Sequence, residues 1–163
     1  MMQSEISEIS QRLAEVPTAA ITGQLFKKHG MRIRWIEGVQ PLDAGNCRFA
    51  GPAYTLRYVP QREDLWLATD LGAPDSKVLR VMDEIPAGAV LMLDMYLEKS
   101  VGALGDVLVS HLIYRGVAGI VADGGMRDVS QIRQLGLPVY CSGPASPPSP
   151  AGLIPAEVQG LIG

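Results

Sequence analysis

Residues 89–141 read AVLMLDMYLEKSVGALGDVLVSHLIYRGVAGIVADGGMRDVSQIRQLGLPVYC, in which short apolar runs alternate with segments of helical spacing. The apolar runs predict strands at 89–93, 119–122 and 138–141. The segments between them predict helices at 104–114 and 129–135. Continuous apolar strands separated by helices favour a parallel βαβαβ sheet with right-handed crossovers, whose ligands bind at the carboxyl ends of the strands.

The chain before this stretch predicts further elements of both kinds. Apolar residues at helical spacing indicate a helix over Ile6–Leu13 and a second over Thr18–His29, which Gly30 ends. Residues that favour strands predict short strands between 31 and 59, most clearly at Ala53–Val59. Lys77–Met82 is predicted to be part of a short helix. The fold class is therefore α/β, a layered sheet with helices on its faces.

Length and composition indicate a single domain. The chain has 163 residues, of which 47% are hydrophobic and 19% charged, so it can bury one sizeable core. We expect an α/β domain over residues 1–143. Residues 144–163 include the run Pro147-Pro148-Ser149-Pro150, and we expect this Pro-rich segment to form an extended arm or a disordered tail.

Charge and hydropathy exclude several kinds of partner. The formal net charge is −3 and the 14 Lys and Arg residues are scattered, so we expect no binding of nucleic acid. The longest strongly apolar run, 89–95, is far shorter than the ~20 residues that span a bilayer. The first residues lack the pattern of a secretory signal, so we expect a cytoplasmic protein with no membrane association. Cys47 and Cys141 are expected to be reduced thiols.

The loop that enters the helix at 104–114 is a candidate binding site. Its glycines, among them Gly105, would let a ligand approach the backbone closely. The unpaired N–H groups of Gly105, Asp106, Val107 and Leu108, at the positive end of the helix dipole, suit a small carboxylate or phosphate. Alternatively, Gly105 only relaxes a tight turn and Asp106 only stabilises its own helix.

The second polar loop, Asp123 to Asp128, follows the next strand and should lie beside the first. Asp128 and Gln131 resemble a capping box at the start of a helix, which would by itself explain Asp128. Asp123 is expected to brace the glycine turn by local hydrogen bonds. The alternative for both loops is that they line one crevice and carry chemistry.

The same residues carry a resemblance to a known family. Asp106, a gap of twenty residues, then Arg127-Asp128, together with the Asp123-Gly124-Gly125 turn, resembles the signature of the RraA-like family. That family contains class II 4-hydroxy-4-methyl-2-oxoglutarate aldolases, related oxaloacetate decarboxylases and the regulator of ribonuclease E activity. The resemblance implies a swivelling β/β/α fold and a homotrimer or hexamer with sites at subunit interfaces.

The resemblance also assigns roles. It implies a 2-oxo acid substrate cleaved to pyruvate, with Mg²⁺ or Mn²⁺ held by Asp128 as the Lewis acid. Arg127 would bind the substrate and stabilise the enolate, Asp106 would act as base, and the N–H groups from Gly105 to Leu108 would hold the pyruvyl carboxylate. The alternative within the family is a non-catalytic regulator that binds another protein. Two features depart from the pattern: Thr22-Gly23-Gln24 where an Asp is usual, and no closing Pro-Gly-Asp turn and hairpin.

Overall fold

A six-stranded sheet organises the computed structural model, which describes residues 2–33, 35–62, 64, 73 and 76–163. Its strand order is β1-β6-β4-β3-β2-β8. The four inner strands are parallel to one another, and the two edge strands pair antiparallel. The strands span Gln40–Pro41 (β1), Ala53–Pro60 (β2), Val90–Asp94 (β3), Gly119–Ala122 (β4), Val139–Cys141 (β6) and Leu153–Val158 (β8). The predicted α/β class and the parallel pairing are confirmed.

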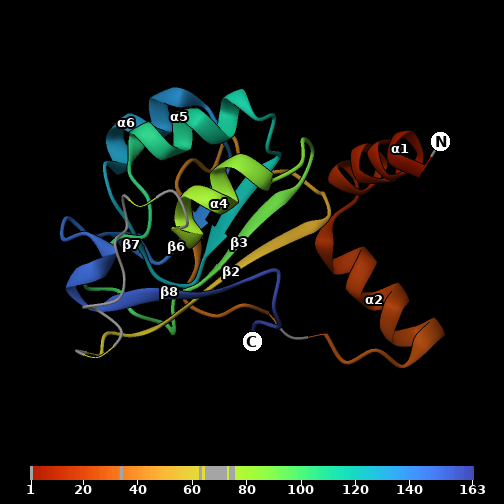
Figure 1. Cartoon of the computed structure of the whole chain (residues 1–163). Helices are drawn as coiled ribbons and strands as arrows, with labels where there is room; N and C mark the ends of the chain where they lie inside the picture. Colours follow the sequence, from red (N-terminus) through yellow and green to blue (C-terminus); the bar gives the residue numbers. More distant parts are fainter. Residues whose placement is uncertain (1, 34, 63, 65–72, 74–75) are drawn as a thin grey trace.

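Three helices cover one face of this sheet (Figure 1). They are α4 (Lys77–Glu84), α5 (Asp106–Tyr114) and α6 (Val129–Leu135). Each connects two neighbouring parallel strands, and the strand order advances in one direction from β2 to β6. Because each of these strand–helix–strand connections is right-handed, all three helices lie on the same face of the sheet. The loops at the carboxyl ends of β3 and β4 consequently lie next to each other.

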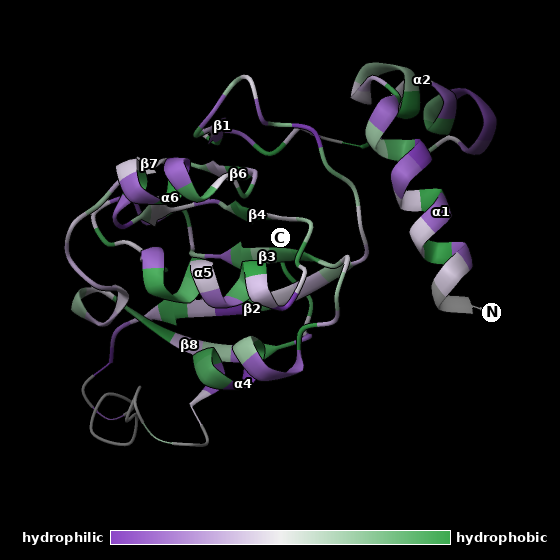
Figure 2. Ribbon diagram, turned by 90° about the horizontal axis from the view of Figure 1, so that it is seen from above, coloured by the Kyte–Doolittle hydropathy of each residue, from purple (hydrophilic) through white to green (hydrophobic). Residues whose placement is uncertain are grey.

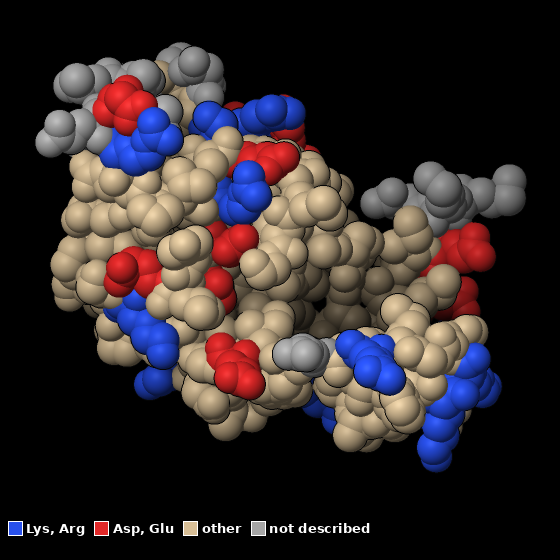
Figure 3. Space-filling model, turned by 90° about the horizontal axis from the view of Figure 1, so that it is seen from below, with Lys and Arg blue, Asp and Glu red and all other residues tan. Residues whose placement is uncertain are grey.

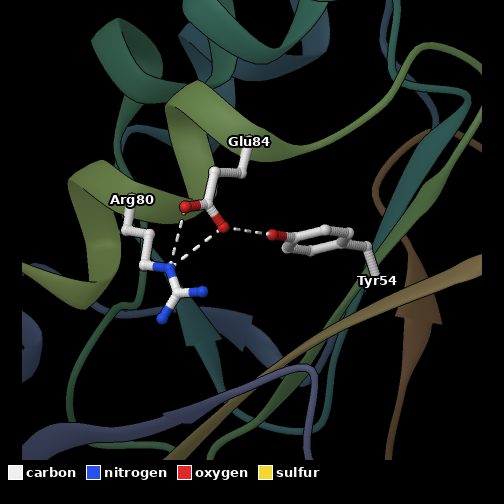
Figure 4. A network of polar contacts seen from close by, with 3 residues as sticks. All are labelled: Tyr54, Arg80 and Glu84. Atoms are coloured by element: carbon white, nitrogen blue, oxygen red, sulfur yellow. Dashed lines mark hydrogen bonds and ion pairs between the residues drawn. The ribbon is translucent and has the colours of Figure 1, made fainter.

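The core lies between the sheet and these helices. Tyr54, Leu56 and Tyr58 alternate along β2 with half-exposed residues, and their side chains are buried. The Tyr54 hydroxyl donates to Glu84 at 3.4 Å, and Glu84 pairs with Arg80 one helical turn earlier (Figure 4). Burial raises the pKa of Tyr54, and the charge of Glu84 raises it further. This network joins α4 to β2 at the end of the sheet opposite the two polar loops.

Most of the predicted elements have the expected bounds. The structure gives α2 (Thr18–His29), β4 and α6 with the predicted limits, and Gly30 ends α2 in the left-handed conformation at φ 64°. α5 begins at Asp106, two residues later than predicted, because Gly105 is extended and serves as its N-cap. Local periodicity therefore located these elements correctly.

The first two helices stand apart from the sheet. α1 (Met2–Glu15) and α2 extend to one side of the molecule in Figures 1 and 2. α2 has no buried residue. Among the described residues, no helix is long and apolar enough to cross a membrane. Figure 3 shows Lys and Arg side chains interspersed with Asp and Glu on the face that it presents.

Residues 144–163 take a different place from the arm or tail that the proline content suggests. β8 pairs antiparallel with β2, and Leu153 and Ile154 are buried. Pro155 lies in this edge strand, where a missing N–H is tolerated. The Pro-rich run forms the 3-10 turn η1 (Ser149–Ala151). Pairing with β2 and burial of apolar residues thus outweigh the local composition.

Candidate functional site

The two polar loops are joined by a small second sheet. β5 (Gly125–Met126) pairs in parallel with β7 (Gly143–Pro144), and Gly102 bridges to Gly125. The Ala103 N–H donates to the Gly125 carbonyl at 2.9 Å, and the Arg127 N–H donates to the Leu104 carbonyl at 3.0 Å. The loop that enters α5 and the loop that enters α6 are therefore fixed to each other by main-chain hydrogen bonds.

Gly102 makes this close approach possible. A Cβ atom at Gly102 would lie 2.5 Å from the Arg127 Cγ and 2.7 Å from the Ala145 carbonyl oxygen. The sequence suggested that the glycines of this loop admit a ligand to the backbone. In the structure, Gly102 instead admits the neighbouring loop, and the Arg127 side chain packs across it.

The N-terminus of α5 lies at this junction. Gly105 is extended, and Asp106 is the first helical residue, with its Oδ1 accepting the Val107 N–H at 2.8 Å. The N–H groups of Asp106 and Leu108 have no acceptor among the described residues. Val107 is exposed and Leu108 is half-buried. Three of the four predicted donors, those of Gly105, Asp106 and Leu108, thus have no acceptor in the described chain, whereas that of Val107 is used locally.

Asp128 directs its carboxylate toward this helix start. Its backbone is left-handed, with φ 46° and ψ 36°, and its Oδ2 lies against Gly105. The capping box predicted for Asp128 and Gln131 is wrong, because an N-cap residue needs an extended backbone to reach the following N–H groups. No cap hydrogen bond forms, and Gln131 accepts instead from the Ser130 hydroxyl at 2.6 Å. The Asp128 carboxylate makes no hydrogen bond within the described part of the chain.

Arg127 carries an unsatisfied group at the same place. Its Nε atom is buried and has no hydrogen-bond partner in the described structure. No ion pair of Arg127 occurs among the residues that are described, although Asp128 follows it directly. The Nε atoms of Arg57 and Arg115 share this state, but only that of Arg127 lies beside the start of α5, where a ligand or water could supply the acceptor.

Asp123 has a different structural role from the one its sequence suggests. It does not bond to its own glycine turn: Oδ1 accepts the Met95 N–H at 2.5 Å and Oδ2 accepts the Leu97 N–H at 3.3 Å. Burial raises the pKa of Asp123, against the lowering effect of these bonds, and the Asp94 charge raises it as well. A cavity of about 480 Å³, lined by Arg57, Asp94 and Asp123 among others, opens here at the carboxyl ends of three strands.

The sequence reasoning did not single out Tyr96 and Leu97. Both have a left-handed backbone, with φ 58° and φ 57°, and both side chains are exposed. Tyr and Leu rarely adopt this conformation, so no local sequence signal could have predicted it.

The carboxylate available at this site suits a cation that keeps most of its water ligands, not one that is bound entirely by protein side chains. Within the described residues, no three His, Cys, Asp or Glu side chains lie close enough together to hold a metal ion. Mg²⁺ keeps several waters and needs only one or two carboxylates from the protein. Asp128, whose carboxylate has no other partner in the described chain, fits that requirement.

The chain belongs to the RraA-like family of aldolase/RraA proteins, whose sequence profile matches residues 5–159. A solved structure from Streptomyces coelicolor, RraAS2, is 34% identical with a TM-score of 0.80, over 95% of this chain and 72% of that one. It is described as an unusual member of the RNase ES inhibitor RraA protein family.

Two other relatives share less of the sequence. A Halalkalibacterium halodurans protein, whose name marks it provisionally as a 4-hydroxy-4-methyl-2-oxoglutarate aldolase, is 28% identical over 88% of this chain. Protein DlpA of Legionella pneumophila is 29% identical over 64% of this chain. The chain spans 60% of the length of the first and 16% of the second.

Proposed function

We propose that this chain carries the site of a divalent-metal-dependent lyase that cleaves 4-hydroxy-2-oxo acids to pyruvate, with oxaloacetate decarboxylation as a side activity. The observation that carries the proposal is that two groups without a hydrogen-bond partner in the described chain lie next to the N-terminus of α5. These are the buried Arg127 Nε and the Asp128 carboxylate. A substrate with adjacent carboxylate and keto oxygens would supply the acceptors that Arg127 lacks.

The reaction needs three tasks from the protein. Cleavage breaks the bond between C3 and C4, and its electron pair passes to the 2-oxo group as the enolate of pyruvate. Asp106 accepts the proton of the C4 hydroxyl, and the hydroxyl oxygen leaves with C4 as a carbonyl group. The enolate then takes up a proton from solvent at C3 to give pyruvate. Arg127 and the free N–H groups of Asp106 and Leu108 hold the substrate carboxylate and the charge that develops on the keto oxygen.

Asp128 is the residue that would hold Mg²⁺ or Mn²⁺. Such an ion supplies Lewis-acid stabilisation of the enolate. Loss of CO₂ from oxaloacetate passes through the same pyruvate enolate but requires no base on a hydroxyl. Asp106 is therefore needed for aldol cleavage and much less for decarboxylation.

A second candidate is a non-catalytic regulator that binds another protein. It is favoured by the 34% identity to RraAS2, a member of a family of RNase inhibitors. Asp106 favours the lyase, because the resemblance ties this residue to the aldolase members of the family. The two candidates differ in one measurable property, the release of pyruvate.

The deciding experiment measures pyruvate release from a panel of 4-hydroxy-2-oxo acids and from oxaloacetate, with Mg²⁺ or Mn²⁺ and after treatment with EDTA. We expect activity that requires the ion. Asp106→Ala should abolish aldol cleavage, spare much of the decarboxylation, and cost only about 0.3–1 kcal/mol of stability. If the metal-loaded wild-type protein performs neither reaction, the lyase proposal is rejected and the regulator replaces it.

A further inference from the structure

The loop after β3 holds two consecutive residues in a backbone conformation that is costly for them. Tyr96 and Leu97 are left-handed, a conformation that residues other than glycine rarely adopt. Their side chains are 70% and 64% exposed, so burial does not offset this cost. Hydrogen bonds from the surroundings must therefore hold the loop in place.

Asp123 supplies two of these bonds. Its two carboxylate oxygens accept the N–H groups of Met95 and Leu97, on either side of Tyr96. Its own backbone is fixed on both sides: its N–H donates to the Leu93 carbonyl at 3.2 Å, and its carbonyl accepts the Ser142 hydroxyl at 3.0 Å. The carboxylate is thus a rigid anchor at the carboxyl end of β4.

The anchored loop contacts the strand that leads to the candidate site. The Glu98 carbonyl accepts the Gly125 N–H at 3.2 Å. Gly124 lies so close to this loop that a Cβ there would be 2.7 Å from the Met95 Cβ. Arg127 follows two residues after Gly125, so a shift of residues 95–98 would be passed to its backbone.

We infer that Asp123 is a positioning residue for the Arg127 and Asp128 site: it fixes loop 95–98, and the loop fixes Gly124 and Gly125. This inference rests on the proposed function for its effect on catalysis. Both Asp123 carboxylate oxygens accept main-chain N–H groups of loop 95–98, so the role that we assign to Asp123 is placement and not contact with the substrate. Its effect reaches the reaction through the placement of Arg127, and a misplacement of about 1 Å can cost roughly 10²-fold in rate.

The test uses the full chain and three variants. Asp123→Asn keeps one acceptor oxygen, and Asp123→Ala keeps none. Asp94→Asn is the matched control, because Asp94 ends the neighbouring strand β3 and, among the described residues, accepts a single hydrogen bond, from the Tyr96 N–H at 3.2 Å. Hydrogen–deuterium exchange followed by NMR reports on the amides of Gly125 and Arg127, with Ile120 in β4 as the internal reference. Pyruvate release gives kcat and KM separately.

We expect at least tenfold faster exchange at Gly125 and Arg127 in Asp123→Ala, a smaller change in Asp123→Asn, and none in Asp94→Asn. The exchange of Ile120 should stay constant. The value of kcat should fall roughly 10–100-fold, more than KM changes. Equal acceleration at Ile120, or a kcat loss that merely follows the unfolded fraction, would overturn the inference.

Exchange also separates this inference from the proposed function. If wild-type protein releases no pyruvate, the lyase proposal fails, and the exchange of Gly125 and Arg127 still decides whether Asp123 fixes the site. If exchange changes only at Met95 and Leu97, Asp123 braces its own loop alone and the positioning role is rejected.

Discussion

Asp128 combines an unfavourable backbone with an unused side chain. A left-handed conformation is uncommon for residues other than glycine, and Asp tolerates it better than most. Here it turns the carboxylate away from its own helix, α6, and toward Gly105 at the start of α5. Residues in such conformations cluster at functional sites, where the strain is part of the arrangement. The geometry of Asp128 is thus a stronger indication of a ligand than its place in the sequence.

Replacing Asp128 with Asn should remove the proposed metal ligand and leave the fold intact. Asn adopts the left-handed conformation as readily as Asp, and no cap hydrogen bond is lost because none is made. We expect thermal stability within about 1 kcal/mol of wild type and a large loss of Mn²⁺ affinity, measured by titration calorimetry. A variant that keeps both full metal affinity and full activity would show that Asp128 is not the ligand.

Arg127 is expected to be irreplaceable by Lys. The Lys ammonium group cannot bind two adjacent oxygens with a planar pair of N–H donors, as a guanidinium does. It also has no group that corresponds to the buried Nε–H of Arg127. The value of kcat for pyruvate release should fall roughly 10²–10³-fold in Arg127→Lys, the range for removal of one transition-state stabiliser. A change confined to KM would mean that Arg127 binds substrate and transition state equally.

At the residue scale, the sequence predicted that the two loops meet but not how each side chain is used. The loops that carry Asp106, Arg127 and Asp128 are joined because parallel strands end at one edge of a sheet, a rule that needs only the element order. The reach of Asp123 to Met95 and Leu97 depends on two left-handed residues. Neither periodicity nor residue type signals that geometry.

At the scale of elements, the small second sheet holds the site together. β5 and β7 have two residues each and are joined to Gly102 by an isolated bridge. Strands this short have no periodicity, so the sequence could not predict them. β8 was also missed, since its pairing with β2 is a contact between distant parts of the chain and its prolines suggest an irregular segment. The inner strands and their helices were predicted because their signals are local and long enough.

Gly102→Ala should disrupt this sheet. The added methyl group would meet main-chain atoms, the Ala145 oxygen at 2.7 Å and the Arg127 nitrogen at 2.8 Å, which cannot move as a flexible side chain would. We expect a loss of about 1–3 kcal/mol in the free energy of unfolding, measured in urea, and a lower kcat from the displaced Arg127.

The matched control for this variant is Gly23→Ala in α2. Nothing lies within 4 Å of a Cβ at Gly23, and alanine is the better helix former. This change should stabilise the protein by about 0.4–1 kcal/mol. If Gly102→Ala is as harmless as Gly23→Ala, the close packing of the two loops is not needed.

At the scale of the whole molecule, the N-terminal arm is unlike the rest. The arm comprises residues 2–33 with 35 and 36, and its helices α1 and α2 extend to one side of the sheet (Figures 1 and 2). It nevertheless exposes large apolar side chains, among them Phe26 at 58% and Trp35 at 68%. A hollow of about 460 Å³ separates it from the sheet face that lacks helices, and its lining includes Trp35, Val121 and Tyr140. Apolar surface of this kind is typical of a protein interface.

We therefore expect the chain to self-associate through the arm. Sedimentation equilibrium should give a multiple of the 17.5 kDa chain mass. Burial of one large apolar side chain contributes about 1.5–3 kcal/mol, so Phe26→Ser combined with Trp35→Ser should shift the assembly toward the monomer. Leu161→Ser is the matched control, since Leu161 is 91% exposed but lies outside the arm. A wild-type protein that sediments as a monomer at micromolar concentrations would contradict the prediction, and a Leu161 variant that dissociates equally would move the interface away from the arm.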